Sequence, residues 1–561
     1  MFDMPTTFEC FDMPLDRYIK RFAAPIILFS IIFSVSILIL LPDVFGKGIF
    51  RLVTCSIPLF GVLVAFAYPK MVVDKKRADI NNNIHYFITH MGVLATSDLT
   101  LTGIFDLLRH KKEEYGALAH EIDKIFLMVD TWHLSMAEAC RFVARRTPSL
   151  ILADFLDRLA HAIDAGEDME RFLTSEQEVV MKQYEVVYQG LLYQIEIMKE
   201  MYLSMVMALI FMAAFAIIMP LISGVDPSQM VTMTVFMFIF IEIVLVFFVR
   251  TKTPNERLWH TIEMETEREQ KIKRVIPVAI TGSLLMLILG ALLRSYLPLQ
   301  IIAALIFTPL ILMGFVIKRA EDDIKRRDDN FASFIRSLGA SASARGGIVD
   351  VALKDLRAHD FGALTRDVNN LYQRLVLRID KLRSWYHFAA ETGSSLIQRF
   401  SNMFVEAIDV GGRADVAGNI ISNNFIHIMG LRKHRYQTGS SLVGVMYGLT
   451  AGVAITLYLS MGIVGTMQDL FRSTELPPEV VGGMLHETLE PGVLNVLLLI
   501  ILIGHSLASS IMIRIVEGGD IRGATLHFVI MMWIGAVSSI LTIKGTASMI
   551  GGFGSMEAIN V

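Results

Sequence analysis

Two short segments of the sequence place an aspartate beside a glycine, a combination that could carry chemistry. The first reads Ala-Ile-Asp-Ala-Gly at 162–166, and the second reads Ala-Ile-Asp-Val-Gly at 407–411. Their setting favours a structural role, because glycine adopts the left-handed conformation that closes a helix without steric cost. We therefore interpret four residues as turn residues of a repeated segment: Asp164, Gly166, Asp409 and Gly411.

Two ionisable residues, Glu242 and His505, lie within apolar stretches long enough to cross a membrane, and Asn495 is a polar neighbour of the second. Such a residue costs about 2.5–3.5 kcal/mol at the centre of a membrane helix on insertion scales. One interpretation is a path for protons or ions. The other is a polar contact between helices of the membrane bundle.

Common signatures of catalysis are absent from the sequence. There is no GxxxxGK[ST] loop to cradle phosphates, no HExxH zinc motif and no GxSxG nucleophile turn. The cysteines have no CxxC spacing and support neither a disulfide framework nor a zinc site: Cys10, Cys55 and Cys140. We expect reduced, structural thiols, no cofactor, no metal and no enzymatic activity.

The composition is that of an integral membrane protein. Of the 561 residues, 53% are hydrophobic and 19% are charged, whereas a soluble domain has about 45–50% apolar and about 25% charged residues. The apolar residues fall in blocks whose length matches a helix that crosses about 30 Å of hydrocarbon. The first 21 residues are polar and precede a full-length span without a small-residue cleavage site. We expect no cleaved signal peptide.

We predict an all-α fold with nine transmembrane helices, at 22–42, 52–69, 202–223, 230–249, 275–293, 298–317, 440–463, 491–513 and 523–544. Lys and Arg cluster at alternate loops between these spans, and the opposite loops contain few of them. Basic residues accumulate on the cytoplasmic side of a membrane. The N-terminus should therefore be cytoplasmic and the C-terminus external, in a multi-pass protein of the cell membrane.

The predicted spans divide the chain into five segments. Residues 1–69 hold an N-terminal segment and spans one and two, 70–201 form a first cytoplasmic helical module, and 202–317 hold spans three to six. Residues 318–439 form a second, more basic cytoplasmic module, and 440–561 hold spans seven to nine with an external tail.

The two modules resemble each other in sequence. Tyr-Phe-Ile-Thr-His-Met-Gly at 86–92 matches Ser-Phe-Ile-Arg-Ser-Leu-Gly at 333–339, an offset of 247 residues, and the Asp-containing segments are offset by 245. Two matches in the same order at nearly the same offset indicate an internal duplication. A period this long is typical of duplicated domains, not of a solenoid.

Local signals predict helices in both modules. Ser135 and Glu138 have the spacing of a capping box, and Pro148 should end the helix that follows. From Asp168 to Met219 there is no proline and one glycine, which predicts a single helix from the first module into span three. The second module repeats this plan after Gly411. Such helices could transmit a movement to the bilayer or act as passive stalks.

The modules differ in charge. Residues 70–200 carry 15 basic and 21 acidic side chains, whereas 318–437 carry 19 basic and 14 acidic ones. The basic residues nearest the membrane suit anchoring to anionic lipid. Those farther along the second module are candidate contacts for an acidic protein partner, although each could simply be solvated: Arg336, Arg345, Arg357 and Arg366.

These features resemble the F-domain platform proteins of type II secretion and type IV pilus machines. The stretch Glu114–Lys124, followed by Ser135-Met-Ala-Glu-Ala and Arg146-Thr-Pro-Ser, is similar to the archaeal branch. The long chain, nine spans and two unequal modules resemble the archaellum (archaeal flagellum) platform proteins of FlaJ/ArlJ type most closely. Bacterial platforms typically have three spans, so the chain departs from them.

The resemblance implies a non-enzymatic platform with two F-type modules. It implies a hexameric ATPase docked on the cytoplasmic side, archaellin or pilin-like subunits, other archaellum motor proteins and a homodimer, with no nucleic acid. In an archaellum the same motor also rotates the filament. Two alternatives stay open: a platform of an archaeal adhesive pilus or a secretion filament, and a secondary transporter. A transporter should show inverted repeats or interrupted spans, whereas this chain has two parallel repeats.

Overall fold

The computed structural model describes residues 10–11, 15–40, 48–223, 227–254, 256–473 and 490–557. The chain falls into two compact units. Unit 1 comprises Met1–Val186, Ile335–Val349 and Met403–Asn424, and unit 2 comprises Val187–Phe334, Asp350–Asn402 and Phe425–Val561.

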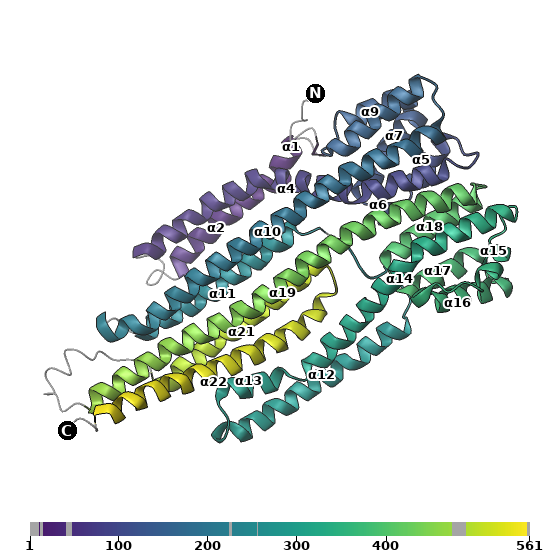
Figure 1. Cartoon of the computed structure of the whole chain (residues 1–561). Helices are drawn as coiled ribbons and strands as arrows, with labels where there is room; N and C mark the ends of the chain where they lie inside the picture. The colour runs from purple at the N-terminus through teal and green to yellow at the C-terminus, as the bar shows by residue number, and fades with distance from the viewer. Residues whose placement is uncertain are drawn as a thin grey trace. The chain divides into compact units, whose positions relative to one another are not determined.

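The predicted all-α class is confirmed, because every regular element in the described ranges is a helix. The long helices are α2 (Ala24–Leu40), α4 (Gly48–Leu94), α10 (Met169–Ser223), α11 (Pro227–Lys252), α12 (Glu267–Leu292), α14 (Leu310–Ala344), α19 (Ala414–Ser473), α21 (Pro491–Glu517) and α22 (Ala524–Glu557) (Figure 1). The shorter α-helices are α1 (Leu15–Tyr18), α5 (Leu101–Arg109), α6 (Lys112–Tyr115), α7 (Ala117–Trp132), α8 (Met136–Ala144), α9 (Leu150–Asp164), α13 (Leu299–Phe307), α15 (Val349–Leu356), α16 (Thr365–Val376), α17 (Lys381–Thr392) and α18 (Ser395–Asp409).

The structure agrees with the predicted number of spans. Eight helices in the described part of the chain are long and apolar enough to cross a membrane, and a ninth span results if the bent pair α13–α14 counts as one. Residues 1–9 and most of the predicted loop at 465–490 lie outside the described residues. Helix α22 continues to Glu557, beyond the predicted end of the last span at 544.

The sixth predicted span, 298–317, is not one straight helix. Helices α13 and α14 meet there at an angle of 44°. Pro309 lies between them, and proline has no backbone N–H to donate while its ring clashes with the preceding turn. The prediction of one continuous helix over 298–317 is therefore wrong at this point.

Four helices run through the ends of the two predicted modules without a break. The predicted helix from Asp168 to Met219 is confirmed as α10, which has 55 residues and is about 80 Å long at 1.5 Å per residue. Helix α19, of 60 residues, continues in the same way through position 439. Helices α4 and α14 pass through positions 70 and 318.

Local start signals explain where the helices of the first predicted module begin. The predicted capping box is confirmed at α8, where the Glu138 N–H donates to Ser135 Oγ and the Ser135 N–H donates to the Glu138 carboxylate, both at 3.2 Å. Ser149 caps α9 by accepting a hydrogen bond from the Leu152 N–H at 3.2 Å. A second capping box, Thr266 with Glu269, starts α12. These contacts satisfy amide groups that a helix start leaves free.

In unit 1, glycines permit close helix crossings. A Cβ placed on Gly92 in α4 would lie 1.6 Å from the Gln177 side chain, and one on Gly339 in α14 would lie 2.4 Å from the Ala414 carbonyl oxygen. Gly92 and Gly339 are the last residues of the two matching segments, and each lies where a helix crosses a neighbour closely, against a side chain at Gly92 and against backbone at Gly339. The buried aromatic core beside them includes Phe87 and Phe105.

Unit 2 contains two apolar cores. One joins α14, α17, α18 and the start of α19 through packed rings, among them Phe331, Phe334, Phe388 and Phe425. The other lies among α13, α19, α21 and α22, where small residues such as Ala304 and Ala454 pack against Leu502 and Met532. Small residues let membrane helices approach closely, and this second core sets the positions of the polar groups described next.

Candidate functional site

Helix α21 ends in a tight turn that carries a charged cluster. Gly518 adopts φ +81° and its N–H donates to the Arg514 carbonyl at 3.0 Å, a left-handed end that favours glycine. Gly519 follows, and a Cβ on it would lie 2.0 Å from Arg514 Nη2. The sequence therefore folds the chain back over its own arginine, because the two glycines leave room for the guanidinium.

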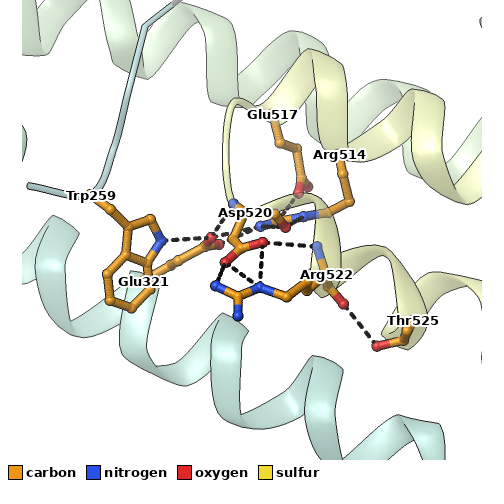
Figure 2. A network of polar contacts seen from close by, with 7 residues as sticks. All are labelled: Trp259, Glu321, Arg514, Glu517, Asp520, Arg522 and Thr525. Atoms are coloured by element: carbon orange, nitrogen blue, oxygen red, sulfur yellow. Dashed lines mark hydrogen bonds and ion pairs between the residues drawn. The ribbon is translucent and has the colours of Figure 1, made fainter. Parts of the chain in front are cut away.

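The arginine meets a glutamate from a different helix. Arg514 Nη2 lies 2.7 and 2.6 Å from the two carboxylate oxygens of Glu321 in α14. Its Nη1 donates to Glu517 at 2.8 Å. The Asp520 N–H and the Trp259 indole N–H complete the shell of Glu321 at 2.7 and 3.3 Å. We call these five residues the turn cluster (Figure 2).

The turn cluster is buried and its polar groups are paired. The side chains of Arg514 and Glu321 are 5% and 3% exposed. Removing such charges from water is costly unless the geometry is good and the remaining hydrogen-bonding groups are satisfied. Here both conditions hold, since Arg514 Nε also donates to the Asp520 carbonyl at 3.3 Å.

Trp259 reaches the cluster from the segment between α11 and α12. This segment pairs with the turn between α17 and α18: the His260 N–H donates to the Gly393 carbonyl and the Ser395 N–H donates to the Leu258 carbonyl, both at 3.0 Å. Trp259 and Ser394 form the isolated antiparallel bridge between them. A long connection is thereby held in place.

Helix α19 supplies a second contact to the end of α21. Arg435 donates from Nε to the Val516 carbonyl at 2.8 Å and from Nη2 to the Ile515 carbonyl at 3.1 Å. Cations near a helix C-terminus pair with its free carbonyl groups and with the helix dipole. Arg432, one turn earlier, lies 3.4 Å from Glu256 and 3.6 Å from Asp328 in α14.

A polar cavity of about 730 Å³ lies beside the turn cluster, between residues 256–265, the start of α12 and the turn at 518–522. His260 lines it with a side chain that is 1% exposed and lies 3.8 Å from Glu269. Burial lowers the pKa of His260, with the charge of Glu269 acting in the opposite direction. The imidazole is therefore neutral near pH 7.

Together these contacts fasten α14 and α19 to the turn between α21 and α22. Both helices also form the predicted second module, so a displacement of either one acts directly on two membrane helices. Sequence reasoning used Arg514 only as a residue of a cytoplasmic loop and did not single out Glu321. The available sequence signal for the turn was the Gly518-Gly519 pair that follows Arg514. This signal did not identify Glu321 as the partner of Arg514.

The structure brings the two predicted intramembrane residues together. Glu242 Oε1 in α11 lies 2.5 Å from His505 Nδ1 in α21, and the side chains are 1% and 0% exposed. Tyr202 in α10 donates to Glu242 Oε1 at 3.3 Å and contacts Ser509 Oγ at 2.9 Å. We call Glu242 and His505 the bundle pair. Asn495 lies elsewhere and accepts a hydrogen bond from Gln300 at 2.8 Å.

The four predicted partner arginines all lie on exposed positions. Arg336 and Arg345 belong to unit 1, and Arg357 and Arg366 belong to unit 2. Arg336 donates to Asn423 at 2.6 Å, whereas Arg357 donates to Asn369 at 3.0 Å and lies over the Tyr372 ring.

The repeated Asp-Gly segments lie at two helix ends. Helix α9 ends at Asp164 and α18 ends at Asp409, and Gly166 and Gly411 follow with φ +66° and +85°. Asp164 forms an ion pair with Arg141. Both glycines have open space where a Cβ would lie, so backbone conformation alone explains the residue type.

In unit 1 the segment around Ala407–Gly411 contacts residues of the first predicted module. Glu406 lies 2.9 Å from His90 Nε2 and 2.6 Å from Lys111 Nζ. Burial acts to raise the pKa of Glu406, but the hydrogen bonds and charges of His90 and Lys111 outweigh it and lower that pKa to about 2. Asn424 also donates to Gln177 at 3.1 Å. His90 and Glu406 adjoin the repeated segments, which therefore meet in this unit.

The cysteines and the acidic groups show no catalytic arrangement in the described ranges. Cys10 and Cys140 are buried, Cys55 is exposed, and none of the three forms a disulfide within the described residues. Burial raises the pKa of Cys140 to about 12, which makes it unreactive. No group of three His, Cys, Asp or Glu residues in those ranges is placed to hold a metal ion.

Comparisons with known proteins identify the family. The family model described as type II secretion system (T2SS), protein F, matches residues 87–217, which include most of α10 and end within its membrane portion. A flagella accessory protein J of Methanocaldococcus jannaschii is 38% identical over 534 residues, 94% of this chain and 94% of that protein. One of Methanococcus voltae is 36% identical over 547 residues, 96% of this chain and 97% of that protein. No solved structure matches.

The membrane helices, the F domain and these relatives define a multi-pass membrane platform protein of the archaellum and type IV pilus class. The chain belongs to the flagella accessory protein J family. The resemblance inferred from the sequence is thereby confirmed. The match to the F-domain model covers the first predicted module but not the second, so the internal duplication stays a prediction.

Proposed function

We propose that the chain is the non-enzymatic platform through which a hexameric cytoplasmic ATPase drives assembly and rotation of a filament of archaellin or pilin-like subunits. The observation that supports this proposal is that helices connect the predicted modules directly to the membrane bundle. Helices α10 and α19 run without a break from the predicted modules into membrane helices, and α14 runs from the second predicted module to its bend with α13. The turn cluster then ties α14 to α21 and α22 through Glu321 and Arg514.

In this proposal the N-terminus and both modules face the cytoplasm, the C-terminus is external, and the ATPase contacts the basic second module. Four exposed arginines supply charge for an acidic surface of that ATPase: Arg336, Arg345, Arg357 and Arg366. Other motor proteins would share the remaining surface. A symmetric hexameric partner also favours a homodimeric platform, which mass measurement in nanodiscs would test; a monomer throughout would count against it.

The binding test uses the full chain in nanodiscs with the purified cognate ATPase. Replacing all four arginines by glutamate should weaken binding at least tenfold, because the contact then places like charges together. Arg171→Glu is the matched control, since Arg171 is an exposed arginine of the first predicted module. Unchanged binding of the four-residue variant would exclude the charge argument.

The alternative of an adhesive pilus or secretion platform differs in partners more than in fold. The relatives are flagella accessory proteins, which favours the flagellar assignment. Deletion of the gene followed by electron microscopy separates the two: loss of swimming filaments with retention of adhesive pili supports the archaellum. The transporter alternative has one interrupted span in its favour, α13–α14, and the parallel order of the two sequence matches against it. Solute uptake into proteoliposomes would support it.

A further inference from the structure

The bundle pair joins two closely packed membrane helices. A Cβ on Gly504 in α21 would lie 3.2 Å from the Ile239 side chain in α11, so the helices approach closely beside His505. The ring of Phe238 meets the His505 imidazole edge-on, with centroids 6.4 Å apart. The pair is thus enclosed by α11 and α21 themselves.

Few polar groups face the pair. Tyr202 from α10 is the titratable neighbour, and Ser509 from α21 bonds to Tyr202. Helices α13 and α22 also pack on α21. Within the described ranges, no Lys, Arg, Asp or Glu from these helices makes an ion pair with Glu242 or His505 apart from the pair itself.

Two atoms of the pair have no hydrogen-bond partner in this environment: Glu242 Oε2 and His505 Nε2. A buried charge that is incompletely paired is costly, and ionisable groups respond by changing protonation. One proton shared between Oε1 and Nδ1 leaves the pair without net charge. Loss of that proton would leave a buried carboxylate, and a second proton would leave a buried imidazolium.

We propose that Glu242 and His505 form an intramembrane proton-binding site that holds one proton while α11 and α21 are packed together. The ligand is a proton because the two facing atoms are 2.5 Å apart, which leaves no room for a larger ion between them. The proton crosses no membrane in this proposal. It links the packing of two membrane helices to pH.

The direction of the pH effect follows from comparing the protons bound in the packed state with those bound in the separated state. In the separated state both side chains reach water. There a glutamate titrates near about pH 4.3 and a histidine near about pH 6.5. Above about pH 6.5 the separated state holds less than one proton, whereas the packed state holds one. Packing therefore weakens by up to about tenfold per pH unit above that value.

The test measures separation of α11 from α21 in the full chain in nanodiscs. Spin labels at the exposed positions Phe236 and Leu507, in a chain with its three cysteines replaced by alanine, report the distance during a titration with SDS. Between pH 7 and pH 8 we expect the ratio of packed to separated chains to fall about tenfold in wild type. The ratio should fall less steeply in Glu242→Gln and in His505→Asn. Equal slopes would overturn the proposal.

Two further variants make the experiment decisive. Gln300→Leu removes the hydrogen bond from Gln300 in α13 to Asn495 in α21, which lies away from the bundle pair, so it should leave the pH slope of α11–α21 separation unchanged. The exchanged variant, Glu242→His with His505→Glu, keeps a carboxyl and an imidazole in contact and should restore the slope. If the single variants do not fold, a flat slope in the exchanged variant rejects the site, and a wild-type slope supports it.

Discussion

Two of the buried acid–base pairs in unit 2, the one in the turn cluster and the bundle pair, differ in how their surroundings satisfy them. In the turn cluster, Arg514 and Glu321 are surrounded by further donors and acceptors, including the Asp520 backbone and the Trp259 indole. In the bundle pair, Glu242 and His505 each keep one atom without a hydrogen-bond partner. A fully satisfied network rigidifies its surroundings. An incompletely satisfied one can respond to protonation, so we expect the first to transmit force and the second to sense the state of the bundle.

The largest effect should come from breaking the turn cluster. Arg514→Gln leaves the Glu321 carboxylate buried without its cation, which costs about 3–5 kcal/mol of unfolding free energy. The measurement is reversible denaturation of the full chain in nanodiscs. Arg522→Gln is the control: Arg522 is 51% exposed and paired with Asp520, so its loss should cost about 0–1 kcal/mol. Equal losses in the two variants would contradict the assigned role of the cluster.

A double substitution separates the contribution of the turn cluster to stability from its contribution to transmitting movement. Glu321→Leu combined with Arg514→Met removes both charges, and apolar replacement of a buried pair is often neutral. We expect the double variant to be more stable than Arg514→Gln by about 2 kcal/mol or more. If filament assembly nevertheless fails in cells, the cluster transmits movement; normal assembly would reduce it to a stabilising contact.

A purely steric change tests the same cluster. The Cβ of Gly519→Ala would lie 2.0 Å from Arg514 Nη2 and 2.6 Å from Glu321 Oε1, so the pair must shift at a cost of about 1–3 kcal/mol. Gly190→Ala in α10 is matched to it, because no atom lies within 4 Å of its Cβ position. The control should be neutral or stabilising, and thermal denaturation of both variants decides.

Tyr202→Phe should have a smaller effect on the bundle pair. It removes one hydrogen bond to Glu242 and one to Ser509 and should cost about 1 kcal/mol. The pH slope of helix separation should persist, since the shared proton lies between Glu242 and His505. A lost slope would assign the proton to the tyrosine instead.

The last comparison concerns the Glu406 contacts of unit 1, where the glutamate side chain is 28% exposed, unlike the turn cluster and the bundle pair. The pKa of Glu406 is lowered to about 2 from an ordinary value of 4.5. The stabilisation is therefore complete above about pH 4.5 and is lost as pH falls towards 2. Glu406→Gln should cost about 1 kcal/mol at pH 7 and flatten acid denaturation in this window. Unchanged acid denaturation would show that the ion pairs contribute nothing.

Features with local causes could be predicted from the sequence. Ser135 and Glu138 are three residues apart, so a capping box is visible in one turn, and the long proline-free stretch behind Asp168 predicts α10. The spans follow from hydrophobic length alone. Pro309 was a visible signal of the bend in the sixth span, but hydropathy outweighed it in the prediction.

Pairings between distant residues could not be predicted. Glu242 and His505 were recognised individually because charge is rare in a span, but they are 263 residues apart and nothing in one sequence links them. Glu321 and Arg514 were missed because an arginine at the end of a span is also expected for topology. Such contacts depend on how helices pack, which a single pattern of polar and apolar residues does not specify.

The four helices that pass through the ends of the predicted modules, α4, α10, α14 and α19, differ in where prolines lie and therefore in their stiffness under twisting. Helix α19 has no proline from Ala414 to Ser473, and α10 has one, Pro220, near its end. Helix α4 contains Pro58 and Pro69, and the α13–α14 pair bends beside Pro309. A helix with all of its backbone hydrogen bonds resists torsion, whereas a proline removes one of these bonds and allows bending. A twist applied to a predicted module should therefore be carried best by α10 and α19, whereas α4 and the α13–α14 pair can bend at their prolines.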